Sequence, residues 1–393
     1  MKITLIAGAR PNFMKVAPII KAIKAFNDAN DGNDVNDGKI SYRLVHTGQH
    51  YDKNMSDTFF EELGIPAPDV NLGCGGGSQA EQTAAIMMAF EKELMAHPAD
   101  IVMVVGDVTS TMACSIVAKK LNTKVCHVEA GIRSWDLTMP EEINRMVTDS
   151  LADYMFTTSE VANRNLVRQG ATLMNDGMSE AKPLNDGMMQ KVWFVGNVMI
   201  DTLLANRSRF RKPEVWDELG LKDKQFIVMT MHRPANVDEE NHLRAMMEQI
   251  IDNVHGLPVI FPIHPRTAKL FYGLWGDEAE LAKRLPNLHI VEPMGYLEFN
   301  YLVERAKAVV TDSGGITEET TVMGVPCITL RDNTERPETC TVGTNELIGT
   351  DPSAIKPALD KLFAGEWKKG AIPELWDGKT AERIIKILSA LER

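Results

Sequence analysis

Short apolar runs recur along the chain, and longer segments with helical periodicity separate them. The runs are continuous rather than alternating, which is typical of parallel strands that are buried on both faces. They form two series, between residues 3 and 197 and between residues 226 and 332. The predicted strands lie at 3–9, 42–48, 101–107, 124–130, 154–159 and 192–197, and at 226–232, 258–264, 288–293, 308–314 and 326–332.

Strands that alternate with helices predict an α/β fold, and two series of them predict two doubly wound Rossmann-like domains. We expect an N-terminal domain over residues 1–205 and a C-terminal domain over residues 206–377. The last segment, 378–393, has an amphipathic pattern and is predicted to pack back on the N-terminal domain as a helix.

Glycines and polar residues gather where the predicted strands end, for example in "AGAR", "VGD", "VEAG" and "TDSGG". Ligands of open α/β sheets bind beyond the carboxyl ends of the strands. Because both domains carry polar residues at these ends, we expect one site in a cleft between two facing domains.

Three segments interrupt the alternation. Residues 27–39 and 175–190 share an "NDG" unit and are rich in turn residues, so we expect surface loops there. The stretch "GCGGGS" at 73–78 is predicted to be a flexible loop, with a mobile lid as the alternative. Neither the G-x-G-x-x-G dinucleotide fingerprint nor a Walker A motif occurs in the sequence.

Composition and net charge limit the kinds of molecule that the protein is expected to bind. The 393 residues, 44% of them apolar, are enough for two cores. A net charge of −12 argues against nucleic acid and anionic membranes, but a local positive site for a small anion is compatible with it. No apolar run approaches the roughly 18 residues of a membrane span, the start is unlike a signal peptide, and the cysteines have no paired spacing. We therefore expect a cytoplasmic protein with reduced thiols.

The stretch "TDSGGITEET" at 311–320 places Ser313, Gly314 and Gly315 at a predicted strand-to-helix turn. Free N–H groups at a helix start attract anions, and glycine lets a phosphate approach the backbone. Glu318 and Glu319 follow about one turn later and suit vicinal sugar hydroxyls. The order of phosphate and then sugar predicts a nucleotide, and a capped helix with acidic residues is the alternative.

Basic residues also follow predicted strands. Arg10 is placed to clamp a diphosphate, with Lys15 further along the same helix, and solvated surface cations are the alternative. His232 and His264 end two strands beside arginines, which suits phosphate or sugar recognition or proton transfer. Their spacing is not that of metal ligands, so no zinc site is expected.

Carboxylates gather at strand ends of the first half. Asp107 and Glu129 each end a predicted strand, and "MPEEINR" adds Glu141 and Glu142. Paired titratable groups in a closed site can serve as acid and base, although helix caps and surface acids are the more ordinary explanation. A further polar loop, expected near the same cleft, carries Arg331, Glu335, Arg336 and Glu338.

Taken in order, these motifs resemble the non-hydrolysing UDP-N-acetylglucosamine 2-epimerases over almost the whole chain. The resemblance implies the glycosyltransferase-B architecture, usually as a homodimer. It implies interconversion of UDP-N-acetylglucosamine and UDP-N-acetylmannosamine, without NAD or another cofactor, for cell-surface polysaccharide precursors. The motifs are "GARPNFMKVAP", "HTGQHYD", "GDVTST", "HVEAGIRSWDLTMPEEINR", "HRPANVD", "IHPRT", "TDSGGITEE" and "RDNTERPE".

The resemblance also implies roles for individual residues. A catalytic group would comprise Asp107, Glu129, Glu141, His232 and Lys15. The UDP-sugar would be bound by Arg10, His264, Phe299 (through backbone near the uracil), Ser313, Gly314, Gly315, Glu319 and Arg336. An allosteric UDP-sugar site of some bacterial members would correspond to Gln49 and His50.

The sequence departs from the family pattern in three places. Residues 69–80 lack the arginine that those bacterial members place beside the allosteric site. Thr317 stands where glutamine is usual, and "RSWDLTMPEE" is the shorter of two family variants.

The implied chemistry is an elimination, because no carbonyl group lies next to C2 of the hexose to stabilise a carbanion. A carboxylate takes the C2 proton while UDP leaves C1, and the resulting 2-acetamidoglucal adds UDP again with a proton on the other face. Asp107 and Glu129 are the expected proton-transfer groups. Glu141 and His232 are expected to orient the sugar or stabilise the departing diphosphate.

Several alternatives stay open. A 2-epimerase of a modified UDP-sugar, such as a diacetamido-uronic acid, would share the motifs. A UDP-sugar glycosyltransferase would share the fold but would need an acceptor site. A non-catalytic UDP-sugar sensor would gain nothing from several carboxylates, and an NAD-dependent epimerase is disfavoured by the missing fingerprint.

Overall fold

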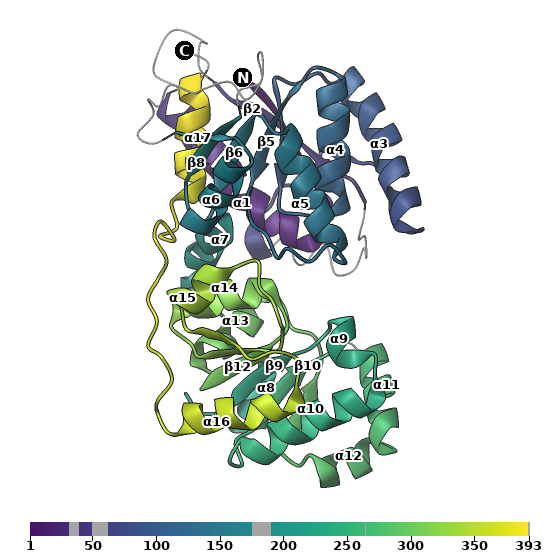
Figure 1. Ribbon diagram of the computed structural model, residues 1–393, viewed down its shortest axis with the longest axis vertical. Coiled ribbons are helices and arrows are strands. Elements are labelled where there is room, and N and C mark those ends of the chain that lie inside the picture. The colour runs from purple at the N-terminus through teal and green to yellow at the C-terminus, as the bar shows by residue number, and fades with distance from the viewer. Residues whose placement is uncertain (31–38, 49–61, 175–189, 264, 392–393) are drawn as a thin grey trace. The chain divides into compact units, whose positions relative to one another are not determined.

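The structure is a computed structural model that describes residues 1–30, 39–48, 62–174, 190–263 and 265–391. It divides into two compact units, Met1–Ala205 with Glu374–Arg393, and Asn206–Pro373. Each unit has one sheet with helices around it (Figure 1). No helix of the described segments has the length and apolar character needed to cross a bilayer.

The sheet of the first unit has the strand order β3-β2-β1-β4-β5-β6-β8-β7, and its recorded strand pairs are parallel. Its strands are β1 (Lys2–Ala7), β2 (Ser41–His46), β3 (Val70–Asn71), β4 (Ile101–Val105), β5 (Lys124–Val128), β6 (Tyr154–Thr157), β7 (Thr172–Leu173) and β8 (Lys191–Phe194). Its helices are α1 (Arg10–Ala29), α3 (Gln79–Ala96), α4 (Thr109–Lys120), α5 (Pro140–Leu151), α6 (Glu160–Arg168), α7 (Val198–Asn206) and α17 (Thr380–Leu391).

The sheet of the second unit has the order β11-β10-β9-β12-β13-β14 and is also parallel in its recorded pairs. Its strands are β9 (Ile227–Thr230), β10 (Val259–Pro262), β11 (Leu288–Val291), β12 (Ala308–Thr311), β13 (Cys327–Thr329) and β14 (Asn345–Leu347). The α-helices are α8 (Glu214–Glu218), α9 (Pro234–Val237), α10 (Glu240–Asn253), α11 (Pro265–Trp275), α12 (Glu278–Arg284), α13 (Tyr296–Arg305), α14 (Gly314–Met323), α15 (Pro337–Thr341) and α16 (Ile355–Phe363), with short 3-10 turns at Arg207–Arg209 and Pro352–Ala354.

The predicted α/β fold with two parallel sheets is confirmed. Both sheets contain the 3-2-1-4-5-6 order of doubly wound folds, in which the direction of winding reverses between the first and fourth strands. That switch point lies between β1 and β4 in one unit and between β9 and β12 in the other. Sequence patterns missed β3, β7 and β14, because strands of two or three residues are too short to show a period.

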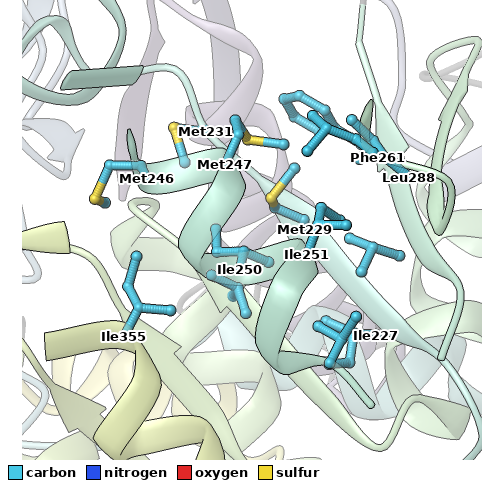
Figure 2. Close-up of a cluster of buried hydrophobic side chains, with 14 of the residues drawn as sticks. Ile227, Met229, Met231, Met246, Met247, Ile250, Ile251, Phe261, Leu288 and Ile355 are labelled. Carbon is cyan, nitrogen blue, oxygen red and sulfur yellow. The ribbon is translucent and has the colours of Figure 1, made fainter. Parts of the chain in front are cut away.

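Both faces of the second sheet are buried, as continuous apolar strands require. Ile227, Met229 and Met231 point to one core, which α10 and α16 help to form (Figure 2). Phe226 and Val228 alternate with them and belong to a second core. In the first unit all five residues of β4 are buried for the same reason.

The chain returns to the first unit after Pro373 and ends there in α17. The carboxylate of Asp201, on α7, accepts the backbone N–H groups of Thr380 and Ala381 at 3.1 and 2.7 Å, which caps α17. Trp376 is 1% exposed, and its Nε1 donates to the Thr158 carbonyl at 2.9 Å. Gly196 has a φ of +100°, and a Cβ added there would lie 2.1 Å from the Leu375 carbonyl oxygen.

We predict that Gly196→Ala destabilises the protein by more than about 3 kcal/mol, because the returning segment must move away from the added methyl group. Gly365→Ala is the matched control, since Gly365 has a φ of +74° but an added Cβ would meet nothing within 4 Å. The control should cost about 1 kcal/mol for the left-handed conformation alone. Thermal and denaturant unfolding measure the stability of both variants. Equal losses of stability in Gly196→Ala and Gly365→Ala would contradict the steric argument.

Candidate functional site

The two switch points carry most of the residues that sequence patterns singled out. In the first unit, Asp107 follows β4 and Glu129 follows the neighbouring strand β5. In the second unit, His232 follows β9, and Ser313 and Gly314 follow β12. Ligands of doubly wound sheets bind at these positions. Each unit therefore offers a candidate site at the carboxyl end of its sheet.

In the first unit, Asn12 fixes the turn between β1 and α1. Its side-chain oxygen accepts the N–H groups of Gly8 and Ala9 at 3.1 and 3.0 Å. Its amide group donates to the Val105 carbonyl, at the end of β4, at 3.0 Å. This buried side chain joins the ends of the two switch-point strands.

A charged pair lies beside this turn. Lys15, in the second turn of α1, contacts the Glu129 carboxylate through its Nζ atom. The side chain of Glu129 is fully buried and that of Lys15 is 12% exposed. Glu129 also has a φ of +72°, an unusual conformation for a residue with a side chain. Such strain is typical of functional positions, where the surrounding structure holds it.

Gly106 has no side chain that would collide with the pair formed by Lys15 and Glu129. A Cβ at this position would lie 2.9 Å from Lys15 Nζ and 3.4 Å from Glu129 Oε2. The residue has a φ of +68°, which glycine adopts without strain. The absence of a side chain at residue 106 lets both charged groups approach the backbone just before Asp107.

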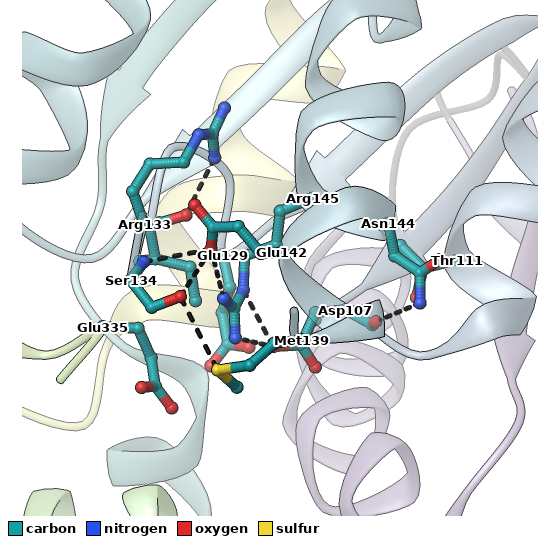
Figure 3. A network of polar contacts seen from close by, with 12 residues as sticks. Asp107, Thr111, Glu129, Arg133, Ser134, Met139, Glu142, Asn144, Arg145 and Glu335 are labelled. Atoms are coloured by element: carbon teal, nitrogen blue, oxygen red, sulfur yellow. Dashed lines mark hydrogen bonds and ion pairs between the residues drawn. The ribbon is translucent and has the colours of Figure 1, made fainter. Parts of the chain in front are cut away.

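The carboxylate of Asp107 belongs to a network with Glu142 and Arg145 of α5 (Figure 3). Arg145 donates to Asp107 Oδ2 from Nε at 3.0 Å and from Nη2 at 2.6 Å. Arg145 Nη1 lies 2.6 Å from Glu142 Oε2, so one guanidinium joins both carboxylates. The side chain of Arg145 is 2% exposed, whereas that of Asp107 is 25% exposed. Asp107 is therefore held in place from the protein side and accessible from the solvent side.

Glu142 anchors the loop before α5, because it accepts the backbone N–H groups of Ser134 and Trp135 at 3.0 and 3.1 Å. Glu141, which the resemblance assigns to the catalytic group, is exposed one position earlier on the same helix. Glu142 is thus committed to protein partners, and Glu141 is accessible to a ligand.

The second unit contains a histidine–aspartate pair. His232 Nδ1 lies 2.8 Å from Asp312 Oδ1. Asp312 Oδ2 accepts the N–H groups of His232 and Arg233 at 2.9 and 2.8 Å and the side-chain amide of Asn236 at 3.1 Å. Although burial opposes the shift, the hydrogen bonds and charge of His232 lower the pKa of Asp312 to about 2. A carboxylate oxygen 2.8 Å from Nδ1 favours the tautomer of His232 that carries its hydrogen on Nδ1.

The start of α14 leaves open space beside one of its first residues. Ser313 is the N-cap residue but makes no side-chain capping hydrogen bond, and its own N–H is held by Thr311 Oγ1 at 3.0 Å. A Cβ on Gly315 would meet nothing within 4 Å, so the surrounding protein does not fill the space beside it. A Cβ on Gly314 would lie 2.8 Å from Glu335 Oε1, and Glu335 is itself paired with Arg331 at 2.6 Å.

The acidic residues one turn into α14 are buried. Glu318 lies 2.6 Å from Arg336, with both side chains almost fully buried. Glu319 accepts the Tyr296 hydroxyl at 2.8 Å. Burial raises the pKa of the Glu319 carboxyl to about 7, against the opposing effect of the hydrogen bonds from Tyr296 and Asn300. Both glutamates therefore have protein partners in this structure.

The remaining predicted residues have simpler positions. Arg10 begins α1, and Phe299 lies half-buried in α13 against the second core of its unit. Gln49, His50 and His264 lie outside the described residues. Within the described part of the chain, no group of three or more His, Cys, Asp or Glu side chains is placed to hold a metal ion.

Sequence patterns missed three supporting side chains, Asn12, Arg145 and Asp312. Asp312 had a signal, since it directly follows a strand at the switch point in "TDSGG". Asn12 and Arg145 had none, because their partners Val105 and Asp107 lie far away in the sequence.

Comparisons with known proteins agree with one another. A family model described as UDP-N-acetylglucosamine 2-epimerase matches residues 34–389. The protein of that name from Methanocaldococcus jannaschii is 38% identical over 398 residues, covering 99% of each chain. Its crystal structure with UDP-GlcNAc and UDP has a TM-score of 0.80 over 99% of this chain and 100% of that one. The UDP-2,3-diacetamido-2,3-dideoxy-D-glucuronate 2-epimerase of Pseudomonas aeruginosa is 37% identical over 351 residues, 89% of this chain and 88% of that one.

We predict that Glu319→Gln is more stable than the unchanged protein at pH 8, by up to about 3 kcal/mol. A raised pKa means that the folded state binds the proton more tightly than the unfolded state does. Stability is therefore lost as the pH rises from about 4.5 through 7, and the amide removes this loss. The difference in stability between Glu319→Gln and the unchanged protein should vanish near pH 5.

Denaturant unfolding between pH 5 and 8 checks this prediction. Glu248→Gln, at an exposed position on α10, is the control and should leave the pH dependence unchanged. A Glu319→Gln stability curve parallel to that of the unchanged protein would contradict the prediction.

Proposed function

Because the chain belongs to the UDP-N-acetylglucosamine 2-epimerase family, we propose that it interconverts UDP-N-acetylglucosamine and UDP-N-acetylmannosamine. The observation that carries the proposal is the placement of two carboxylates, Asp107 and Glu129, after the adjacent strands β4 and β5. Each has a cationic partner that fixes its position, Arg145 for Asp107 and Lys15 for Glu129. Inverting C2 requires proton removal on one face and proton delivery on the other, which two fixed carboxylates supply.

The proposed reaction has two balanced steps. One carboxylate takes the C2 proton, the C2–H electrons form a C1=C2 double bond, and the C1–O bond breaks to release UDP. The products, 2-acetamidoglucal and UDP, stay bound. A UDP oxygen then attacks C1 again, and an acid delivers a proton to the opposite face of C2. No external oxidant or reductant takes part, and no metal or nucleotide cofactor is required.

In our proposal the second unit binds the UDP group. The N–H groups at the start of α14 suit the diphosphate, because they carry partial positive charge and Gly315 leaves space beside them. His232 presents Nε2, which in the protonated form donates to the departing diphosphate. A ribose contact by Glu319 would compete with the Tyr296 hydroxyl, and a phosphate contact by Arg336 would compete with Glu318.

We assign Glu141 and Glu142 different roles. The exposed Glu141 orients the hexose, as the resemblance implies. The buried Glu142 positions Arg145 and the loop at Ser134 and Trp135. Losing Glu142 would remove one carboxylate partner of Arg145 and would loosen the support of Asp107.

A second candidate substrate follows from the Pseudomonas aeruginosa relative, whose name specifies a diacetamido-dideoxyglucuronate. The elimination chemistry is the same for both sugars, because only C1 and C2 react. Supplying each UDP-sugar separately to the purified protein and comparing kcat/KM distinguishes the two. We favour the N-acetylglucosamine substrate because the relative from Methanocaldococcus jannaschii matches over more of the chain.

We also propose that the protein acts as a homodimer in the cytoplasm. Support for a partner copy comes from apolar side chains that are 38–65% exposed on two helices, Met88 and Met95 on α3 and Ile143 and Met146 on α5. Support for a reducing compartment comes from the five cysteines, which are all free thiols. Light scattering coupled to gel filtration measures the oligomeric state.

We predict that Asp107→Asn lowers turnover by about two orders of magnitude or more, because the amide neither removes nor delivers the C2 proton. UDP affinity should stay within about twofold, since the proposed UDP contacts lie on the second unit. Proton NMR in heavy water follows both inversion and deuterium entry at C2, with UDP-N-acetylglucosamine as the only substrate.

Asp100→Asn is the matched control. Asp100 precedes β4 and accepts the Lys2 N–H at 2.6 Å, whereas Asp107 follows the same strand. The control should keep full turnover. Near-normal turnover in Asp107→Asn would remove Asp107 from the proton transfer, and no deuterium entry with the unchanged protein would overturn the proposed function itself.

We predict that Asp312→Asn lowers kcat by about a hundredfold or more, because an amide can donate to His232 Nδ1 and thereby stabilise the opposite tautomer. UDP binding should persist, since the start of α14 is unchanged. Asp277→Asn is the control, because Asp277 caps α12 and asparagine caps equally well. Equal kcat values for both variants would contradict the proposed role of the pair.

A further inference from the structure

A buried histidine, His127, lies behind the carboxylates but is absent from the mechanism proposed above. It is the fourth residue of β5, pairs in register with Val104 of β4, and is 0% exposed. Its Nε2 lies 2.8 Å from the Gly106 carbonyl oxygen, and its Nδ1 lies 2.7 Å from Asp149 Oδ1. The ring thus bridges α5 and the residue immediately before Asp107.

Hydrogen-bond chemistry restricts how this ring can act. A carbonyl oxygen only accepts, so Nε2 must donate to Gly106. Burial would raise the pKa of Asp149, but the charges and hydrogen bonds of His127 and Arg133 outweigh burial and lower it. The ring therefore cannot turn over without losing its contacts to both Gly106 and Asp149.

Both carboxylate oxygens of Asp149 have protein partners. Its Oδ2 accepts the Gly131 N–H at 3.1 Å and lies 2.6 Å from Arg133 Nη2. The side chains of His127, Asp149 and Arg133 are all fully buried. Burying the charges of Asp149 and Arg133 carries a desolvation penalty, and well-packed apolar residues at such positions often give equal or greater stability. Stability alone is therefore a poor explanation for the burial of His127, Asp149 and Arg133 together.

The contacts that surround Gly106 and Asp107 indicate a role for the buried group of His127, Asp149 and Arg133. The Gly106 N–H donates to the Val128 carbonyl at 3.0 Å, and the Gly106 carbonyl accepts from His127. Asn144 of α5 donates to the Asp107 carbonyl at 2.9 Å, and Arg145 holds the Asp107 carboxylate. These contacts hold the backbone of residues 106 and 107 and the Asp107 carboxylate. Two of the four come from α5 itself, and a third comes from His127, which contacts Asp149 of α5.

We propose that His127 is a positioning residue, which transmits the position of Asp149 on α5 to the Gly106 carbonyl and so fixes the direction of the Asp107 carboxylate. This inference rests on the proposed function, in which Asp107 transfers the C2 proton. Misplacing a reacting group by about 1 Å can lower a rate by about a hundredfold. The ring acts through Gly106 and touches no substrate.

Two substitutions separate the two hydrogen bonds. In His127→Asn the amide nitrogen takes the place of Nδ1, which keeps the bond to Asp149 and loses the bond to Gly106. In His127→Gln the amide nitrogen takes the place of Nε2, which keeps the bond to Gly106. We expect His127→Asn to lower kcat at least tenfold and His127→Gln to lower it less than threefold, with the dissociation constant of UDP unchanged in both.

Thr157→Val controls for general loss of buried hydrogen bonds. Thr157 Oγ1 is buried, lies 2.5 Å from Asn163 Oδ1 and 3.2 Å from the Trp193 carbonyl oxygen, and donates its single hydrogen between these two acceptors. Thermal unfolding of all three variants sets an assay temperature at which each is folded. A merely structural role for His127 would lower stability in both His127 variants without separating their kcat values.

The results distinguish failure of the proposed epimerase function from failure of the positioning role of His127. If the unchanged protein neither inverts UDP-N-acetylglucosamine nor takes up deuterium at C2, the proposed function fails. If the unchanged protein is active and His127→Asn retains its kcat while folded, or if His127→Gln loses as much as His127→Asn, the positioning role fails and the function stands.

Discussion

The close approach of Lys15 and Glu129 to the backbone at Gly106 is the constraint on which the first unit depends. A side chain at residue 106 would lie 2.9 Å from Lys15 Nζ, so the two charges and the strand end can meet only at a glycine. The backbone at Gly106 is also held from both sides by β5 and its histidine. Because Asp107 comes next, the same constraint sets the spacing between the two carboxylates. The chemistry we propose therefore depends on the absence of one side chain.

The two units use the same switch point for different chemistry. In the first unit Asp107 follows the fourth strand of the 3-2-1-4-5-6 order and Glu129 follows the fifth, and we propose that both carboxylates transfer protons. Arg145 and Lys15 are their cationic partners. In the second unit His232 follows the first strand and lies beside Asp312, and the start of α14, where we propose that the diphosphate binds, follows the fourth. The fold supplies the position, and the residues after each strand decide whether a proton or an anion is handled there.

Sequence patterns predict the sheets well because burial on both faces leaves a strong local signal, as the five buried residues of β4 show. They also predict that Asp107 and Glu129 lie at strand ends, and the structure places Asp107 two residues after β4 and Glu129 directly after β5. They do not distinguish Glu141 from Glu142, since neighbouring helix residues differ by about 100° in direction and only the packing of α5 decides which is buried. Nor do they predict that Glu318 and Glu319 have buried protein partners, because Arg336 and Tyr296 lie in other elements.

The buried charges of the first unit are best understood together. Arg133, Arg145, Asp149, Glu129 and Glu142 all have side chains that are at most 2% exposed. Packing for stability alone would favour apolar residues at such positions. A reaction that moves a proton between fixed atoms has a different requirement, because hydrogen bonds with defined directions hold a carboxylate more accurately than apolar contacts do. Arg145 and Asp149, one turn apart on α5, both act on residues 106 and 107. In our proposal, the placement of α5 against the sheet therefore sets the position of the proton-transferring carboxylate.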